Sequence, residues 1–282
     1  MEGRQYTDEE LEKLKKLELM ILKEVNDICD KHNIEYYVYS GTALGAARHE
    51  GFIPWDDDID IAVFRKDYEK LLKILDKELS PEFYLITMNK QEECFFSISK
   101  VCLKGTRFED WWVDQVSFEE GIYIDIFSLD KVPKSKFKRA IYHHGGNLIN
   151  HILMNATVRV RTGSKLMDWG HEFLYRFLNT IPISKEYWKK VCYKILTRYE
   201  DTDAEYVTSY FSQISCPTFG KYDAFLISDL SPSKKVKFEN LMVSAPKNLD
   251  AILKIQYGDY MKLPPEEKRI NHSPEVLDFG EY

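Results

Sequence analysis

Residues Gly41–Ile61 read GTALGAARHEGFIPWDDDIDI, a turn of small residues followed closely by four carboxylates within five positions. Like charges this close repel one another unless a cation lies among them. Ile59 and Ile61 alternate with Asp58 and Asp60, and this period of two is typical of a strand. On a strand the two carboxylates project from one face, with Cα atoms roughly 7 Å apart. The pattern therefore predicts a divalent metal bound to a phosphate chain.

Two other interpretations of the acidic run fit its sequence less well. A surface acidic loop would leave the apolar residues within and beside the run poorly placed. An EF-hand loop starting at Asp56 would need glycine at its sixth position and glutamate at its twelfth. The chain has Ile61 and Asp67 at those positions.

Length and composition predict one compact unit with a substantial core, since the chain has 282 residues and 44% hydrophobic residues. No run of about 18 apolar residues predicts a membrane span. The first residues lack the apolar segment of a signal peptide, so we expect a cytoplasmic protein, with the inner face of the membrane as one place for it. The five cysteines are widely spaced and form no C-x-x-C pair. We therefore expect buried free thiols, not zinc or disulfides.

Charge is distributed unevenly along the chain. The net charge is -7, yet residues 132–200 contain 13 Lys and Arg against 4 Asp and Glu. This basic segment could face an anionic acceptor or a membrane surface. Ordinary solvated helix faces are the alternative. We expect no nucleic-acid partner.

Capping signals and periodicity predict the helices. Thr7 and Glu10 form a capping box, followed by apolar residues at helical spacing to about Lys31. Further helices are expected over Leu44–His49, from Tyr68 to just before Ser80-Pro81, and over Asn248–Gln256, with Gly258 suited to the position after the helix end. Residues 134–200 should be mostly helical, with breaks at Gly145-Gly146, Thr162-Gly163 and Ile181-Pro182.

Strands are predicted by β-rich and alternating segments. They are expected at Ile34–Tyr39, Ile59–Val63, Tyr84–Thr87, Phe95–Leu103, Arg107–Glu109, Gly121–Phe127, Ala224–Ile227, Val236–Phe238 and Leu241–Val243. The tail after Pro265 should be irregular.

The strand Gly121–Phe127 offers a third carboxylate. Its isoleucines face one way, whereas Tyr123, Asp125 and Phe127 face the other. An aspartate on an otherwise apolar face is costly to bury without a partner. Asp125 is therefore a natural third member of the cluster. A strand-end aspartate that points into water is the alternative.

Three motifs together resemble the LicD family, which includes bacterial phosphorylcholine transferases and, more distantly, the fukutin-related sugar-phosphate transferases. They are the block Tyr37–Ile61, the strand GIYIDIF of Gly121–Phe127, and a set that runs from Phe238-Glu239 through YGDYMKLPP of Tyr257–Pro265 to Arg269 and His272. The motifs lie in family order and span about residues 7–274. Residues 134–222 match weakly and could set the acceptor.

The resemblance implies an α+β nucleotidyltransferase fold, in which a mixed sheet carries helices and presents two acidic strands at its mouth. Residues 1–282 would form a single unit, with a core of about 7–130 and 222–274 that includes a C-terminal α/β segment, and a helical insertion of about 134–221. The turn Ser40-Gly41-Thr42 would hold the nucleotide phosphates. Two magnesium ions are implied: Asp58 and Asp60 would bind one, and Asp125 would bind the second or take the proton from the acceptor hydroxyl.

Other positions of the motifs are expected around the donor. Lys100, between the acidic motifs, and Arg48, after the turn, would contact phosphate. A solvated strand lysine, and an arginine paired with Asp56 or Asp57, are the alternatives. Tyr257, Asp259 and His272 would line the site, although His272 could be a surface histidine. Trp55, Trp111, Trp112 and Tyr123 could form an aromatic box for a quaternary ammonium, or could be core packing.

The expected function is magnesium-dependent transfer of phosphocholine, or a similar phospho-alcohol, from a CDP-activated donor. The acceptor would be a hydroxyl of a cell-envelope glycan, such as a teichoic acid or lipopolysaccharide precursor, which could be lipid-linked and so imply peripheral membrane contact. Pyrophosphate cleavage needs cations that neutralise charge on the leaving CMP. A nucleotidyltransferase with a small acceptor and a catalytically silent glycan- or nucleotide-binding protein stay open, although the intact aspartates argue against the second.

Overall fold

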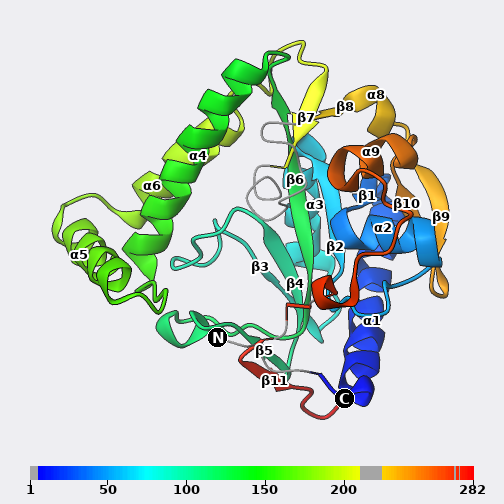
Figure 1. The fold of residues 1–282 in the computed structure, drawn as a ribbon, viewed down its shortest axis with the longest axis horizontal. Coiled ribbons are helices and arrows are strands. Elements are labelled where there is room, and N and C mark those ends of the chain that lie inside the picture. Colours follow the sequence, from blue (N-terminus) through cyan, green and yellow to red (C-terminus); the bar gives the residue numbers. More distant parts are fainter. Residues whose placement is uncertain (1–5, 210–223, 270, 273) are drawn as a thin grey trace.

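The centre of the molecule is a mixed seven-stranded sheet (Figure 1). The computed structural model describes residues 6–209, 224–269, 271–272 and 274–282. The strands of this sheet are β1 (Tyr36–Val38), β2 (Asp60–Phe64), β3 (Phe83–Ile86), β4 (Ser99–Leu103), β6 (Tyr123–Val132), β7 (Tyr206–Thr208) and β8 (Phe225–Leu226). Their order is β1-β2-β6-β4-β3, and β7 pairs with both β6 and β8. Only β2 and β6 are parallel among these pairs, so the implied mixed sheet of an α+β fold is confirmed.

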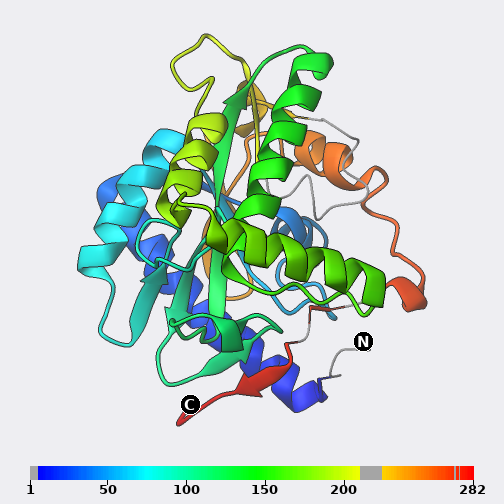
Figure 2. The same ribbon diagram turned by 90° about the vertical axis from the view of Figure 1, so that its left-hand side faces the viewer.

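Helices cover both faces of the sheet (Figure 2). They are α1 (Asp8–His32), α2 (Ser40–His49), α3 (Arg65–Glu78), α4 (Lys136–Thr157), α5 (Lys165–Thr180), α6 (Lys185–Leu196), α8 (Ile227–Leu230) and α9 (Leu249–Tyr257). One core cluster joins α1 and α3 to the side chains of Ile61 and Ile126. A second cluster joins α4 and α6 to Phe127 and Leu129 on the opposite face.

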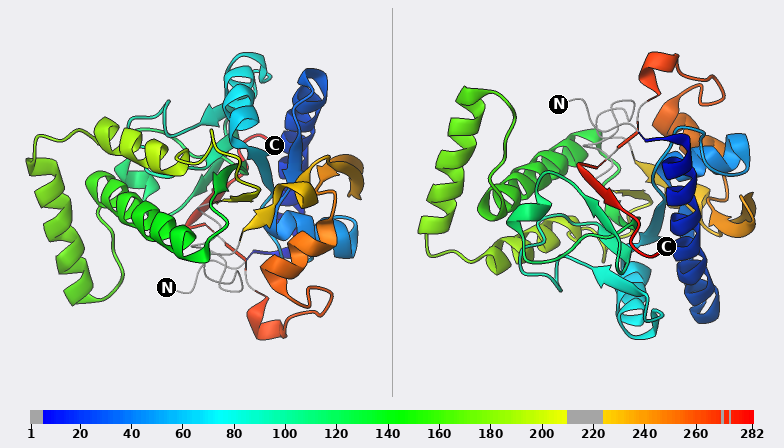
Figure 3. Two further views of the ribbon diagram at one scale, coloured as in Figure 1. Left: turned by 90° about the horizontal axis from the view of Figure 1, so that it is seen from above. Right: turned by 90° about the horizontal axis from the view of Figure 1, so that it is seen from below.

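Two small sheets and two short 3-10 helices complete the described fold. Strands β9 (Lys234–Phe238) and β10 (Leu241–Ala245) form an antiparallel pair, and β10 lies beside β1. Strand β5 (Arg107–Glu109) pairs with β11 (Val276–Asp278), so the C-terminal segment returns beneath the central sheet (Figure 3). The 3-10 helices are Val113–Gln115 and Glu266–Lys268. None of the helices within the described ranges is long and apolar enough to cross a bilayer.

The strongest local signals in the sequence are confirmed. The Thr7 side chain accepts a hydrogen bond from the Glu10 amide, and the Glu10 side chain accepts one from the Thr7 amide, so the capping box starts α1 as expected. Gly258, with φ of 65°, follows the end of α9. The described cysteines Cys29, Cys94, Cys102 and Cys192 are buried free thiols, as predicted, and Cys216 lies outside the described residues.

Several predicted boundaries are wrong. Ser40-Gly41-Thr42, expected as a turn before a helix, forms the first turn of α2 itself. The segment Phe95–Ile98 precedes β4 as a loop, because its apolar side chains are buried against the second core cluster and not paired in the sheet. The pair Gly145-Gly146 does not break α4, since Gly146 is buried within it. The tail after Pro265 is not wholly irregular, because β11 pairs with β5.

Candidate active site

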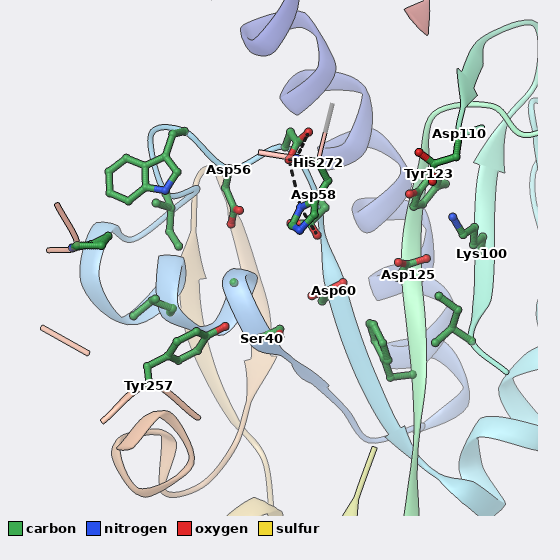
Figure 4. Close-up of a pocket in the computed structure, with 18 of the residues that line it drawn as sticks. Ser40, Asp56, Asp58, Asp60, Lys100, Asp110, Tyr123, Asp125, Tyr257 and His272 are labelled. Carbon is green, nitrogen blue, oxygen red and sulfur yellow. Dashed lines mark hydrogen bonds and ion pairs between the residues drawn. The ribbon is translucent and has the colours of Figure 1, made fainter. Parts of the chain in front are cut away.

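Three of the predicted side chains lie in one row across the sheet. Asp60 on β2 is the register partner of Asp125 on β6, and Lys100 on β4 is the partner of Asp125 on its other side. Their strand neighbours Ile61 and Ile126 enter the first core cluster, so the three polar side chains project from the opposite face. Figure 4 shows this arrangement, with Ser40 and Tyr257 across the opening. The predicted alternation around Asp125 is confirmed.

A cavity of about 790 Å³ lies over this row. Its wall is built from α2, the acidic loop, the strands β2, β4, β5 and β6, the loops before β4 and after β5, α4, and the end of α9 with the segment after it. The predicted site residues that line it are Ser40, Gly41, Arg48, Asp58, Asp60, Lys100, Asp125, Tyr257, Asp259 and His272. Residues far apart in the sequence therefore meet at one cavity, as the three motifs imply.

The carboxylates of the cavity are in an environment that disfavours their charge. Burial raises the pKa of Asp60 well above its usual value, and the neighbouring Asp58 and Asp125 raise it further. Burial raises the pKa of Asp125 to about 7, against the lowering effect of Lys100. One buried oxygen of Asp125, Oδ1, has no hydrogen-bond partner among the described residues. A buried, unpartnered carboxylate oxygen beside further carboxylates calls for a cation or a proton.

The donor set fits a cation that is shared with a substrate. Across residues 6–209, 224–269, 271–272 and 274–282, no three His, Cys, Asp or Glu side chains form a ready metal cage. Magnesium is typically held by one or two carboxylates, with water and substrate phosphates as its other ligands. The arrangement does not fit an EF-hand, because positions five to nine of a loop that starts at Asp56 form the strand β2 of the central sheet.

The N-terminus of α2 points toward the carboxylate row. Ser40 and Gly41 line the cavity in the first turn, where backbone N–H groups have no partner within the helix. A Cβ atom on Gly41 would lie 2.7 Å from Oδ2 of Asp56, so glycine allows the acidic loop to approach the helix. Such a helix end favours anions.

Thr42 differs from expectation. Its side chain is buried, does not line the cavity, and accepts a hydrogen bond of 2.8 Å from the Asp60 backbone amide. It therefore fixes α2 to the start of β2 and is not placed to touch phosphate. The predicted contact of Thr42 with phosphate is corrected to a positioning contact.

Lys100 is not the solvated strand lysine that the sequence left open. It is 5% exposed, its ammonium is ion-paired with the buried Glu120, and it lies 3.4 Å from the ring centroid of Tyr123. This pairing keeps a positive charge beside Asp125. Glu120 carries no signal in the sequence that would distinguish it from its exposed neighbour Glu119.

Removal of the carboxylate from this pair should destabilise the fold. We expect Glu120→Gln to lower the free energy of unfolding by about 3 kcal/mol, because it leaves a buried ammonium without its counter-charge. Glu119→Gln, with the same change on an exposed side chain, should have little effect. Urea unfolding measures both variants, and equal stabilities would show that the Lys100–Glu120 pair contributes nothing.

The C-terminal segment is fixed to the site by two predicted residues. Arg48 donates a hydrogen bond of 2.9 Å to the carbonyl of Tyr260. The His272 amide donates to Oδ1 of Asp57 at 2.9 Å, and the imidazole Nδ1 lies 3.8 Å from Oδ2 of Asp58. The imidazole Nδ1 also lies 3.6 Å from Oδ1 of Asp57, and this side-chain interaction, with the nearby carboxylates, raises the pKa of His272 to about 9.

Three of the four residues expected in the aromatic box, Trp55, Trp112 and Tyr123, line the cavity. Trp111 does not line the cavity, and the Trp55 ring is covered by the Arg269 guanidinium at 4.9 Å. Trp112 does line it and packs against Phe95 and Phe96. The aromatic wall comes instead from the loop before β4 and from β5 and β6, with Phe96, Phe108, Trp112, Tyr123 and Phe127 among its lining residues.

Sequence reasoning also missed polar groups around the row. Asp110 lines the cavity near the aromatic wall, and Asn150 of α4 reaches it from the helical segment. Glu18 of α1 is buried, and burial together with the acidic loop raises its pKa well above the usual value. Its place between Leu14 and Ile21 on the apolar stripe was the available signal.

Comparison with known proteins shows what this chain is similar to. Residues 33–153, from β1 into α4, match the family model described as LicD/FKTN/FKRP, nucleotidyltransferase domain. These residues match the LicD family. It is 25% identical over 267 residues to the lipopolysaccharide cholinephosphotransferase LicD of Haemophilus influenzae, covering 90% of this chain and 92% of that protein. The resemblance to the LicD family and the nucleotidyltransferase fold that it implies are thus confirmed.

Two uncharacterised rickettsial proteins are similar to a shorter part of this chain. The protein from Rickettsia prowazekii is 34% identical over 118 residues, which is 42% of this chain and 40% of that protein. The protein from Rickettsia typhi is 40% identical over 74 residues, or 25% of this chain and 22% of that protein. Neither name describes an activity.

Proposed function

We propose that this protein transfers phosphocholine from CDP-choline to a hydroxyl of a cell-envelope glycan, with magnesium as cofactor. The observation that carries the proposal is the row of Asp60, Asp125 and Lys100, which meets the N-terminus of α2 in one cavity. The similarity to a cholinephosphotransferase over most of both chains supports the choice of head group. A lipopolysaccharide or teichoic acid precursor fits the acceptor class.

Magnesium would be held by Asp58 and Asp60, with Asp125 able to bind a second ion. When bound, the metal neutralises charge on the pyrophosphate. The first-turn amides of α2 and the Arg48 guanidinium would bind and orient the donor phosphates. All of these groups face the same cavity.

Asp125 is suited to receive the proton of the acceptor hydroxyl. The acceptor oxygen forms a bond to the phosphorus next to choline, and the bond from that phosphorus to the bridging oxygen breaks. CMP leaves with the electron pair, and the hydroxyl proton passes to a carboxylate oxygen of Asp125. The pKa of about 7 suits a group that must take up a proton near neutral pH.

The aromatic wall supports a quaternary ammonium as the head group. Phe96, Phe108 and Trp112 present apolar rings in the cavity, and Asp110 adds a carboxylate. Aromatic faces attract a desolvated cation that offers few hydrogen bonds. A hydroxyl-rich head group would leave its donors and acceptors unpaired on such a wall.

A panel of CDP-alcohols tests the head group. We expect CMP release, followed by mass spectrometry in the presence of magnesium and a lipopolysaccharide acceptor, to be fastest with CDP-choline and much slower with CDP-glycerol or CDP-ribitol. Trp112→Leu keeps an apolar side chain but removes the ring, and it should reduce this preference. Equal rates with all donors, or a preference for CDP-ribitol, would contradict the proposed head group.

Nucleotidyl transfer is the second candidate, because the matching family model is named for a nucleotidyltransferase domain. In that reaction the phosphorus next to cytidine is attacked, and free phosphocholine is the leaving group. The two reactions therefore differ in the product released from the same donor. A catalytically silent binding protein would bind the donor without releasing either product.

A further inference from the structure

The helix α5 exposes a large apolar face, which a helix packed on a globular core normally buries. Leu166, Trp169, Phe173 and Phe177 are 79%, 69%, 60% and 51% exposed. Their spacing of three and four residues puts them on one face of the helix. The rings of Trp169, Phe173 and Phe177 stack in succession, with centroids 6.1 and 6.4 Å apart.

The other side of α5 faces the protein, where Leu178 is buried and polar side chains bond to neighbouring segments. His171 Nδ1 lies 2.7 Å from Oδ1 of the buried Asn155 in α4. Asn179 donates a hydrogen bond of 3.2 Å to the carbonyl of Ala156. Glu172 is ion-paired with Arg159 at 3.6 Å. These contacts fix the rotation of α5, so the exposure of its apolar face follows from specific bonds on the other face.

The helix also lies at the edge of the molecule, away from the sheet (Figures 1 and 3). A further exposed apolar row, Phe137, Ile141 and Leu148, follows the surface of α4. The apolar side chains of this region thus far exceed the scattered single residues that a monomer normally exposes. Their arrangement on outward-facing helices points to a surface that is covered in use.

The positive charge of this region indicates which kind of surface covers the apolar face. Arg159, Arg161, Lys165 and Arg176 are exposed on α5 and the segment before it. Residues 132–200 carry 13 basic against 4 acidic residues, although the chain as a whole has a net charge of -7. A symmetric contact with a second copy would bring these like charges together. An anionic lipid surface would attract them.

We propose that the outward face of α5, formed by Leu166, Trp169, Phe173 and Phe177, docks on an anionic phospholipid bilayer. Interfacial helices combine Trp, Phe and Leu on one face with basic residues nearby, and they lie in the membrane plane. Asn150 and Met154 of α4 line the cavity from the same helical segment. Docking would therefore hold the cavity near the bilayer, where a lipid-linked acceptor would be found. This surface is separate from the carboxylate row, so the docking can be tested independently of the proposed reaction.

Vesicle flotation with the full-length protein tests this docking. We expect binding to vesicles of phosphatidylglycerol and phosphatidylethanolamine, weak binding to neutral vesicles, and release at 1 M salt, where the Debye length falls to about 3 Å. The double variant Trp169→Glu/Phe173→Glu should bind at least about tenfold less, because it loses two large apolar contacts with lipid. Arg161→Glu/Lys165→Glu should reduce the binding to anionic vesicles only.

Met242→Glu, a charge placed on an exposed apolar side chain of β10, is the matched control and should bind as the wild type does. A second measurement uses a variant that keeps the face apolar. Brominated acyl chains should quench tryptophan fluorescence of the wild type, and Trp169→Phe should bind equally while losing this quenching.

Two results would overturn the proposal. One is failure of the wild type to bind anionic vesicles at low salt, or equal binding by Trp169→Glu/Phe173→Glu. The other is a wild type that is dimeric by light scattering, does not bind vesicles, and becomes monomeric in the double variant. That outcome would assign the face to a second copy of the chain.

Discussion

Asp125→Asn should lower kcat by about a hundredfold to ten-thousandfold, the range expected for loss of a general base. The side chain faces the cavity beside Asp60 and Lys100, and its Oδ1 has no hydrogen-bond partner among the described residues. Asparagine keeps its shape but cannot receive the acceptor proton. The affinity for CDP-choline, measured by calorimetry, should change much less, because other groups bind the donor phosphates.

Asp110→Asn is the matched control for this variant. It removes a carboxylate from the same cavity but outside the row across β2, β6 and β4. Its kcat should fall far less than that of Asp125→Asn. If Asp125→Asn instead reduces only donor affinity and leaves kcat intact, Asp125 binds the donor and is not the base.

Asp58→Asn should reduce turnover by at least about a thousandfold, because a bound metal supplies several kcal/mol of charge stabilisation to phosphoryl transfer. The fold should survive. Burial and Asp57 raise the pKa of Asp58, whereas His272 lowers it. Neutralising one of several crowded carboxylates should therefore raise the unfolding temperature in the absence of magnesium by about 2 °C.

Calorimetry gives this prediction a readout other than activity. The wild type should bind CDP-choline more tightly when magnesium is present, and Asp58→Asn should lose that dependence. Asp56→Asn, the same change in the same loop, should also relieve repulsion but should keep the magnesium dependence. Full activity of Asp58→Asn would refute the assignment of Asp58 as a metal ligand.

The parts of the site that could be predicted are those in which a local sequence pattern determines the direction of a side chain. Period-two alternation placed Asp60 and Asp125 on one face of their strands, and the structure brings them into register. The capping box of α1 and Gly258 after α9 are likewise local signals, and both are confirmed. The motifs of the family resemblance also predicted that residues from distant segments meet, and these residues line one cavity.

Features that depend on tertiary contacts were not predictable in the same way. Gly146 costs helix stability of about 1 kcal/mol relative to alanine, yet α4 continues through it because it is buried on a packed face. The loop Phe95–Ile98 alternates poorly and is held by core contacts instead of strand pairing. Thr42 belongs to a Ser-Gly-Thr segment that is typical of a phosphate-binding turn. Its hydroxyl oxygen, however, accepts a hydrogen bond from the Asp60 amide.

The exposed apolar face of α5 shows the same limit. The sequence indicates an amphipathic helix, and it does not say which side meets the protein. That direction is set by the contact of His171 with Asn155 and by the ion pair of Glu172 with Arg159. The predicted basic surface also needs a correction, because Arg139 and Lys189 are buried against backbone carbonyls and cannot face a membrane.

Identifying the products formed from CDP-choline is the most direct test of the central claim that the carboxylate row supports phosphocholine transfer. The purified chain is incubated with CDP-choline, magnesium and a lipopolysaccharide acceptor, and both products are identified by mass spectrometry. We predict that CMP is released and that the acceptor gains phosphocholine, with neither product formed in the presence of a chelator. Release of free phosphocholine with cytidylate on the acceptor, or donor binding without either product, would contradict the account.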